Sequence, residues 1–156
     1  MTAVFLDTAV IMYAAGRPHR LRDPSRAIIR GVAEGRLQAV ISAEVIQEIL
    51  HRFVAIRRTD VGASIARDAL DLFAPVVPIT HDVMNRMPGL VTRYPDLAAR
   101  DLVHVATCLE LGINEIISPD RGFDAVTEVR RIAIEDADAW ERARAGDPVE
   151  PIPPLD

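Results

Sequence analysis

Four acidic side chains in the sequence lie where a carboxylate needs a partner. Asp7 directly follows the apolar run 4–6, and Asp120 comes shortly after the apolar run 116–117. Asp101 and Glu48 lie within two segments whose apolar residues have helical spacing. Because an unpaired carboxylate is costly to bury, each needs a cation, a hydrogen-bond network or a proton. We expect the four side chains to meet in one crevice.

Asp101 is the most informative of these acids. In the segment LAARDLVHVATCLE, helical geometry places it on the same side as Leu97, His104 and Cys108, and this side is largely apolar. Arg100 lies elsewhere around the helix. The alternative is a structural Asp bonded to a neighbouring helix end, and the sequence leaves both interpretations open.

Glu48 is a better candidate than Glu44 in the segment SAEVIQEILHRF. Glu44 falls in the first turn after Ser42, the expected helix cap, where the helix dipole favours an acid for structural reasons. Glu48 lies deeper in the helix, at the edge of the apolar stripe, and has no capping role. We therefore expect Glu48 to face the crevice.

A cluster of four carboxylates is tolerable only when it is protonated or binds a hard divalent cation. Ligation by oxygen atoms alone favours Mg²⁺ or Mn²⁺ over zinc or copper. In proteins, Mg²⁺ held by a few carboxylates and waters commonly acts on phosphate esters. The acids therefore predict a Mg²⁺-dependent site in which Asp7 is a metal ligand.

The composition excludes several other kinds of site. All 18 basic residues are Arg, so a Walker A loop and a Schiff-base lysine are excluded. The single cysteine, Cys108, cannot form an intrachain disulfide or a thiolate zinc site, and we expect it to be buried. The net charge of −5 argues against non-specific coating of nucleic acid. Without a signal peptide or a membrane span, the expected location is the cytoplasm.

The elements that must position these acids alternate between strand and helix patterns. This alternation predicts one α/β domain, residues 1–145, with a mainly parallel sheet of four to five strands and helices on both faces. The expected strands are 4–7, 36–42, 74–80, 114–118 and 129–134. The expected helices are 23–35, 43–56, 61–73, 81–95 with a break near 88–89, 96–112 and a segment around Trp140. The Pro-rich acidic tail, 146–156, is expected to be extended or disordered.

Four segments resemble the PIN-domain ribonucleases, in particular the toxins of VapBC-type toxin–antitoxin pairs. They are FLDT at 5–8, SAEVIQEIL at 42–50, ARDLVHVATCLELGI at 99–113 and IISPDRGFDAV at 116–126. The resemblance extends from Val4 to Trp140 and implies a three-layer α/β/α PIN-like fold. It also implies that Asp7, Asp101 and Asp120 bind the metal and that Glu48 completes the catalytic acids.

The resemblance extends to supporting residues and includes one departure. Ser42 falls at the family's usual small hydroxyl position, and His104 and Asp124 are further candidates to support the acids. Many members carry another acid where this chain has Gly122. The fourth acidic position of the site therefore depends on Asp120, helped by Asp124. A site with weakened catalysis would agree with the glycine at position 122.

The implied activity is hydrolysis of RNA phosphodiester bonds by a Mg²⁺-dependent endoribonuclease acting on tRNA, rRNA or mRNA. The implied partners are a second copy of the chain and an antitoxin, one Arg of which fills the acidic crevice. The expected RNA-binding residues come mainly from the basic loop after the first strand, which is expected to begin near the crevice, together with the arginine beside Asp120; they are Arg17, Arg20, Arg22 and Arg121, with His19 in the same loop. Arg52, Arg57 and Arg58 are weaker candidates. Two alternatives stay open: another Mg²⁺-dependent phosphoesterase, and a catalytically weak PIN-like module that binds proteins.

Overall fold

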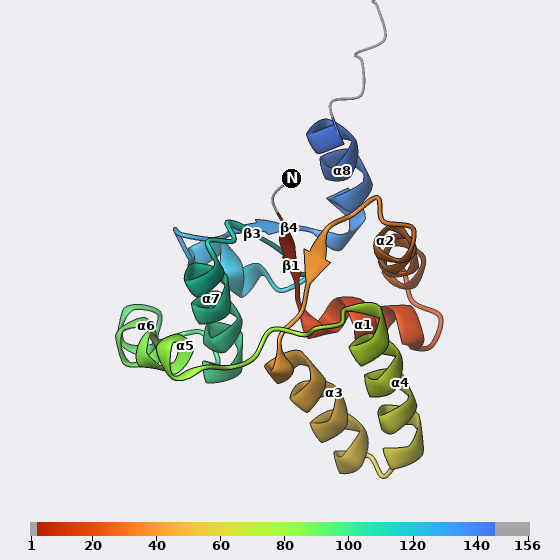
Figure 1. Ribbon diagram of the computed structural model, residues 1–156, viewed down its shortest axis with the longest axis horizontal. Helices are drawn as coiled ribbons and strands as arrows, with labels where there is room; N and C mark the ends of the chain where they lie inside the picture. The colour runs from red at the N-terminus through yellow and green to blue at the C-terminus, as the bar shows by residue number, and fades with distance from the viewer. Residues whose placement is uncertain (1–2, 146–156) are drawn as a thin grey trace, which may run out of the picture.

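The computed structural model describes residues 3–145 and has a four-stranded parallel sheet at its centre (Figure 1). The strands are β1 (Val4–Leu6), β2 (Ala39–Val40), β3 (Glu115–Ile117) and β4 (Arg130–Ile132), in the order β2-β1-β3-β4. Phe5 pairs with Val40 on one side and with Ile116 on the other. The strands are short apolar runs because both faces of the sheet are covered.

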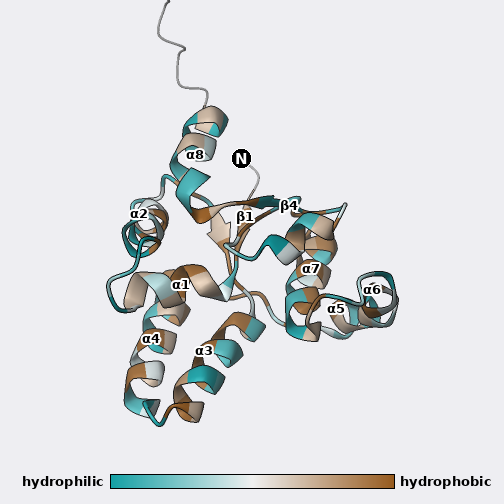
Figure 2. Ribbon diagram, turned by 180° about the vertical axis from the view of Figure 1, so that it is seen from behind, coloured by the Kyte–Doolittle hydropathy of each residue, from teal (hydrophilic) through white to brown (hydrophobic). Residues whose placement is uncertain are grey.

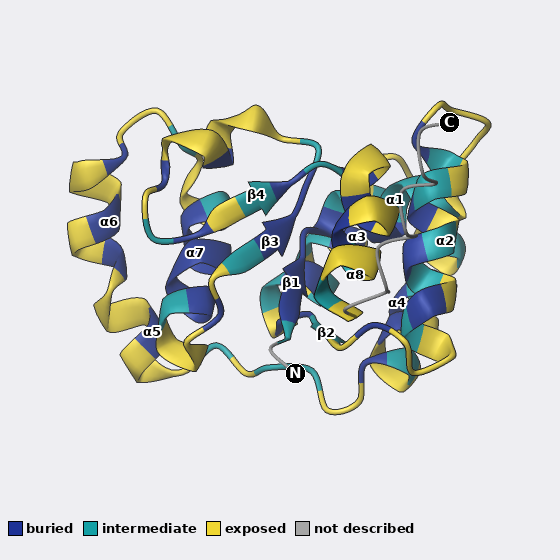
Figure 3. Ribbon diagram, turned by 90° about the horizontal axis from the view of Figure 1, so that it is seen from above, coloured by how far each residue is buried: buried dark blue, intermediate teal, exposed yellow. Residues whose placement is uncertain are grey.

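Helices cover both faces of the sheet, so the α/β/α expectation is confirmed (Figure 3). One side carries α5 (His81–Asn85), α6 (Met87–Arg93) and α7 (Ala99–Leu111). The other side carries α1 (Thr8–Ala15), α2 (Arg22–Ala33), α3 (Ala43–Ala55), α4 (Thr59–Leu72) and α8 (Ala137–Ala145). Two 3₁₀ turns, η1 (Arg121–Ala125) and η2 (Ile134–Asp136), flank β4 along the chain.

The core lies between the sheet and these helices. Phe5, Leu6, Ile116 and Ile117 are fully buried, and the strands β1 and β3 are buried over most of their length (Figure 3). Outside the sheet, α3 and α4 alternate hydrophobic and hydrophilic residues, as expected for helices with one buried face (Figure 2).

Helix α7 is the most deeply buried helix near the site. Its residues 102–108 are all buried, including Cys108, as expected. The helix ends at Gly112, whose φ of 66° is the left-handed conformation that glycine adopts without strain. It begins at Ala99, three residues later than the start of the expected segment 96–112, and this places Asp101 in the first turn.

Two expected elements differ from the structure. Segment 74–80 forms no strand of the sheet; within it, only Val77 makes an isolated bridge, to Ser42. Pro75 and Pro78 each lack the backbone N–H that a strand ladder requires, which explains the difference. The expected break near 88–89 occurs two residues earlier, at Arg86, between α5 and α6.

The described part of the chain was expected to form one domain without a membrane-spanning helix. The described residues 3–145 surround one sheet, and the tail 146–156 lies outside them. Within 3–145, no helix combines the length and the hydropathy needed to cross a bilayer.

Candidate active site at the carboxyl ends of the strands

The predicted acids come from the ends of neighbouring strands and from two helices. Because β1 and β3 are adjacent and parallel, their carboxyl ends meet, and the backbone N–H of Asp7 donates to Ile117 O at 3.0 Å. Asp120 follows β3 after two residues. Asp101 lies in the first turn of α7, and Glu48 lies in the middle of α3. The topology therefore brings the four acids to one end of the sheet, as the sequence predicted.

His104 lies between two of these acids. Its Nε2 is 2.8 Å from Glu48 Oε1 and 3.7 Å from Asp7 Oδ1, and its side chain is 0% exposed. Among the described residues, neither ring nitrogen has an aligned hydrogen-bond partner, so these contacts act through charge. His104 was expected only as a supporting residue, and the structure places it at the centre of the cluster.

Ser118 is a residue that the sequence analysis missed. Its Oγ donates to Asp7 Oδ2 at 2.6 Å and accepts from the backbone N–H of Asp120 at 3.0 Å. Ser118 is 0% exposed. It therefore joins the two acids that follow β1 and β3. The available signal was its place directly after the strand and two residues before an acid.

Asp120 and Asp124 have different roles in η1. Asp120 is exposed and caps the turn, because its Oδ1 accepts from the N–H of Gly122 at 2.8 Å. Its second oxygen makes no hydrogen bond within residues 3–145. Asp124 instead accepts two hydrogen bonds from Arg131, at 2.8 and 3.2 Å. The direct help from Asp124 that the sequence suggested is not observed; its carboxylate is paired with an arginine.

Ser42 also differs from its expected role. It stands at the N-cap position of α3, but its side chain makes no capping hydrogen bond. Its Oγ is buried and has no hydrogen-bond partner among the described residues. The start of α3 is instead fixed by the backbone, since Ala43 N donates to Val77 O at 2.8 Å.

Burial and mutual repulsion raise the pKa values of the clustered acids. Burial, and then the charges of Asp7, Asp120 and Glu48, raise the pKa of Asp101 to about 6 against the opposing effect of His104. Burial likewise raises the pKa of Asp7, although His104 and Ser118 oppose it. Burial lowers the pKa of His104, but the surrounding carboxylates outweigh it, so the net shift is upward.

The raised pKa of Asp101 makes the stability of the metal-free protein depend on pH. Because the folded pKa of about 6 exceeds the ordinary 3.8, this group contributes stability that is fully present below pH 3.8 and is lost as the pH rises through 6. Asp101→Asn should remove that loss, which is about 1–2 kcal/mol after allowance for solvent screening. In urea unfolding with EDTA, the free energy of unfolding of the variant should therefore rise relative to that of the wild type between about pH 4 and pH 7.5. A difference between the two free energies that does not change with pH would contradict the raised pKa of Asp101.

The chemistry of the candidate ligands fits a hard cation, and their spacing limits how many of them can bind it directly. All the candidate ligands are carboxylates, and no arginine in the described chain forms an ion pair with Asp7 or Asp101. Across residues 3–145, however, no three acidic, histidine or cysteine side chains are grouped closely enough to hold one ion together. Mg²⁺ usually keeps several waters and needs only one or two direct carboxylates. The acids therefore fit an ion that is held partly through water.

The predicted RNA-binding arginines lie around the cluster rather than within it. The loop 16–21 is separated from Asp7 by the eight residues of α1, about 12 Å. In this loop Arg17 is exposed and Arg20 lies 3.8 Å from Glu135, while the half-buried Arg22 begins α2. Arg121 is exposed beside Asp120. The weaker candidates lie at the end of the α3–α4 hairpin, far from the sheet (Figure 1); they are Arg52, Arg57 and Arg58.

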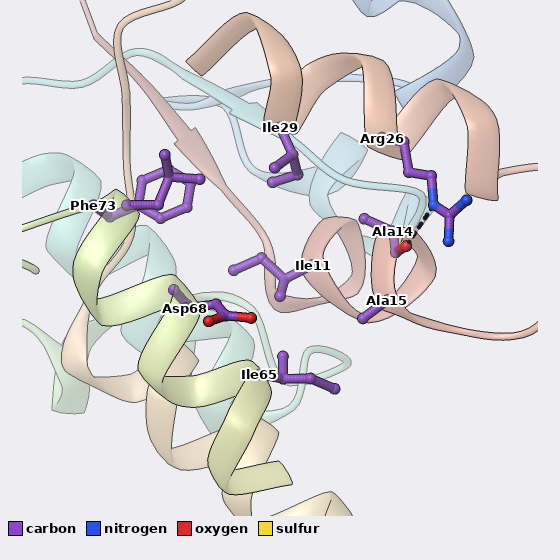
Figure 4. A pocket seen from close by; sticks show the side chains of 10 residues that line it. Ile11, Ala14, Ala15, Arg26, Ile29, Ile65, Asp68 and Phe73 are labelled. Carbon is purple, nitrogen blue, oxygen red and sulfur yellow. Dashed lines mark hydrogen bonds between the residues drawn. The ribbon is translucent and has the colours of Figure 1, made fainter. Parts of the chain in front are cut away.

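An apolar groove lies between α1, α2 and α4. Figure 4 shows Ile11, Ile29, Ile65 and Phe73 pointing into the space between α1, α2 and α4. The groove has a volume of about 240 Å³ and also includes Arg26 and Asp68. We refer to it as the α1–α2–α4 groove.

Comparisons with known proteins decide the family. The PIN-domain family pattern matches residues 4–129. The chain belongs to the PIN-domain family. Ribonuclease VapC13 of Mycobacterium tuberculosis is 30% identical over 130 residues, which cover 83% of this chain and 99% of the relative. Ribonuclease VapC23 of the same species is 35% identical over 113 residues, or 72% of this chain and 89% of the relative. The expected resemblance is confirmed.

Solved structures support the fold of this PIN domain. FitAB bound to an IR36 DNA fragment aligns with a TM-score of 0.67 at 19% identity, covering 84% of this chain and 94% of that one. VapBC2 from Rickettsia felis, bound to a DNA fragment from its promoter, aligns with a TM-score of 0.64 at 12% identity, covering 85% and 98%. At these identities the likeness concerns the fold alone.

Proposed function

We propose that this PIN domain is a Mg²⁺- or Mn²⁺-dependent endoribonuclease and the toxin of a toxin–antitoxin pair. The observation that carries the proposal is the buried cluster in which Asp7, Glu48 and His104 meet beside Asp101. Curated relatives that match over most of their length are named VapC ribonucleases. An RNA substrate and an antitoxin partner would place the protein in the cytoplasm.

Asp7, Asp101 and Asp120 would hold the metal ion, and the ion would neutralise the scissile phosphate and lower the pKa of a bound water. Ser118 holds Asp7 Oδ2 and the backbone of Asp120, so these two acids are presented together. His104 lies 2.8 Å from Glu48 Oε1 and attracts it by charge, and Glu48 would accept a proton from the attacking water. No serine or cysteine nucleophile is needed.

The RNA would be bound through its phosphates on both sides of the acids. Arg121 lies beside Asp120, and Arg17 and Arg20 lie in the loop that follows α1, a helix of eight residues and thus about 12 Å long. In the same loop, the rings of His19 and Tyr13 stack with their centroids 4.6 Å apart, and His19 Nδ1 accepts from Leu21 N. The loop is thus held in one conformation, which lowers the cost of ordering it on RNA.

The antitoxin would use the α1–α2–α4 groove and the acids together. Because α1 begins beside Asp7 and its later residues line the groove, one segment can fill the groove with apolar side chains and reach the acids with an Arg. An Arg there would satisfy the same carboxylates as the metal. A homodimer is part of the proposal, since α3 and its C-cap carry three exposed apolar residues, Leu50, Val54 and Ile56.

Partner binding can be tested at the rim of the groove. Ala15→Trp should block co-purification with the product of the neighbouring reading frame, because the indole would occupy the exposed rim. The matched control is Ala139→Trp, at an exposed position of α8 outside both the groove and the proposed homodimer surface. Equal co-purification of both variants would exclude the groove as the docking site.

The activity is tested by incubating purified protein with tRNA, rRNA and mRNA transcripts in EDTA, Mg²⁺, Mn²⁺ or Ca²⁺. We expect endonucleolytic cleavage with Mg²⁺ or Mn²⁺ only. Absence of cleavage under every condition would favour a protein-binding module, a second candidate that Gly122 and the lack of three closely grouped metal ligands within 3–145 support. Release of inorganic phosphate from small phosphoesters would instead indicate a phosphoesterase.

A further inference from the structure

Arg131 links three segments that surround the acids. It lies on β4, the edge strand next to β3, and its side chain is only 13% exposed. Its Nε and Nη2 donate to the two carboxylate oxygens of Asp124 at 2.8 and 3.2 Å. Its Nη1 donates to the backbone O of Ser118 at 3.1 Å. One guanidinium therefore ties η1 to the residue that directly follows β3.

The neighbouring Arg130 has no such connection. It is exposed, and its Nη2 donates to Glu115 at 3.1 Å, at the opposite end of β3. The two arginines are adjacent on the same strand and each pairs with one acid. Arg130 is thus a matched control for charge and strand stability without a link to the site.

The segment that Arg131 holds carries the hydrogen bonds of two candidate metal ligands. The Oγ of Ser118 donates to Asp7 and accepts from the N–H of Asp120. Asp120 in turn caps η1 through Gly122 N, and Asp124 belongs to the same turn. The contacts of Arg131 therefore fix both ends of the segment 118–124 that positions Asp7 and Asp120.

We propose that Arg131, anchored by Asp124, is a positioning residue for the metal site. The planar guanidinium makes the bidentate bond to Asp124 and the bond to Ser118 O at once, which a lysine ammonium cannot reproduce. This proposal rests on the proposed metal-dependent function. Arg131 itself contacts neither the metal nor the substrate; it acts through Ser118 and the turn that bears Asp120.

The alternative, a purely electrostatic effect of Arg131, has the opposite sign. A positive charge near the carboxylates repels a cation, so removing that charge alone would tighten metal binding. Loss of positioning would weaken it, by about tenfold as for other residues that orient metal ligands. The direction of the change in Mn²⁺ affinity therefore separates the two explanations.

The experiment measures Mn²⁺ binding to the full chain by calorimetry at a temperature where every variant is folded by circular dichroism. We expect Arg131→Met and Arg131→Lys to weaken binding about tenfold and Asp124→Asn to weaken it less, with Arg130→Met unchanged. A variant that is merely less stable, but still folded, would keep the wild-type affinity.

The outcomes distinguish this proposal from the one on which it rests. If the wild type binds no Mn²⁺ and cleaves no RNA, the proposed function fails and the role of Arg131 fails with it. If the wild type binds Mn²⁺ and Arg131→Met binds it equally or more tightly, only the positioning role is overturned. Full affinity in Arg131→Lys would also overturn it, because the hydrogen-bonding geometry of the guanidinium would then not be needed.

Discussion

Asp101→Asn is expected to lower RNA cleavage by about 10²- to 10³-fold, as for removal of one charge-stabilising group from an active site. The amide keeps the shape of the side chain but cannot bind the metal as an anion. Burial and neighbouring charges already raise the pKa of this carboxyl to about 6, so a neutral side chain should not destabilise the metal-free protein. Cleavage rates with Mg²⁺ and thermal unfolding in EDTA, measured on the same preparation, check both halves of this result.

Asp7→Asn should behave in the same way, because Ser118 Oγ can still donate to the amide oxygen. The control for both variants is Asp96→Asn. Asp96 is exposed and lies shortly before α7, the helix that carries Asp101, so this variant should cleave RNA like the wild type. Wild-type activity in Asp101→Asn, or its loss only together with unfolding, would mean that the acid is structural.

His104→Leu is expected to destabilise the metal-free protein at neutral pH by about 3 kcal/mol, because breaking a buried ion pair leaves charges without a partner. The imidazole is 0% exposed, and its Nε2 lies close to both Glu48 and Asp7. For a domain of this size, the loss corresponds to a fall in Tm of about 6–12 °C. Thermal unfolding in EDTA at neutral pH measures it directly.

The matched control for this prediction is His51→Leu, an exposed histidine on α3. It should change the free energy of unfolding by no more than about 0.5 kcal/mol. Burial raises the pKa of Asp7, so at a pH low enough to protonate Asp7 the cost of His104→Leu should shrink, since one charge fewer is left unpaired. A cost that is independent of pH would indicate that His104 stabilises the fold by packing against Phe5 alone, with ring centroids 5.2 Å apart.

The meeting of the acids was predictable because it depends on a general rule of parallel sheets. Asp7 and Asp120 each follow a short apolar strand, and adjacent parallel strands end at the same edge. The choice of Glu48 over Glu44 depended on helical spacing, and the contact of Glu48 with His104 agrees with it. Glu44 still lies close enough for Glu48 to raise its pKa, after the larger effect of burial.

Features that depend on distant parts of the chain were not predictable in the same way. The pairing of Asp124 with Arg131 requires the register of β4 against β3, which no local pattern encodes. Ser118 resembled an ordinary turn residue before a proline, and its bond to Asp7 joins positions 111 residues apart. The expected strand at 74–80 failed because its apolar residues suggested a strand, while its prolines prevented pairing.

Asp101 lies nearer the start of its helix than the sequence pattern predicts. The sequence placed this acid well inside a helix that started at residue 96, where a carboxylate needs a special explanation. The helix starts at Ala99, so Asp101 lies in the first turn, where the dipole favours an acid in any case. Its role in the site therefore depends on its neighbours Asp7, Glu48 and Asp120 rather than on its place along the helix.

Anomalous diffraction from crystals of the wild-type protein soaked in Mn²⁺ tests the shared cation most directly. We expect one strong peak bordered by the carboxylates of Asp7 and Asp101, with Asp120 on the same side, and loss of that peak in Asp101→Asn crystals. A peak elsewhere, or no peak at Mn²⁺ concentrations that support RNA cleavage, would contradict it.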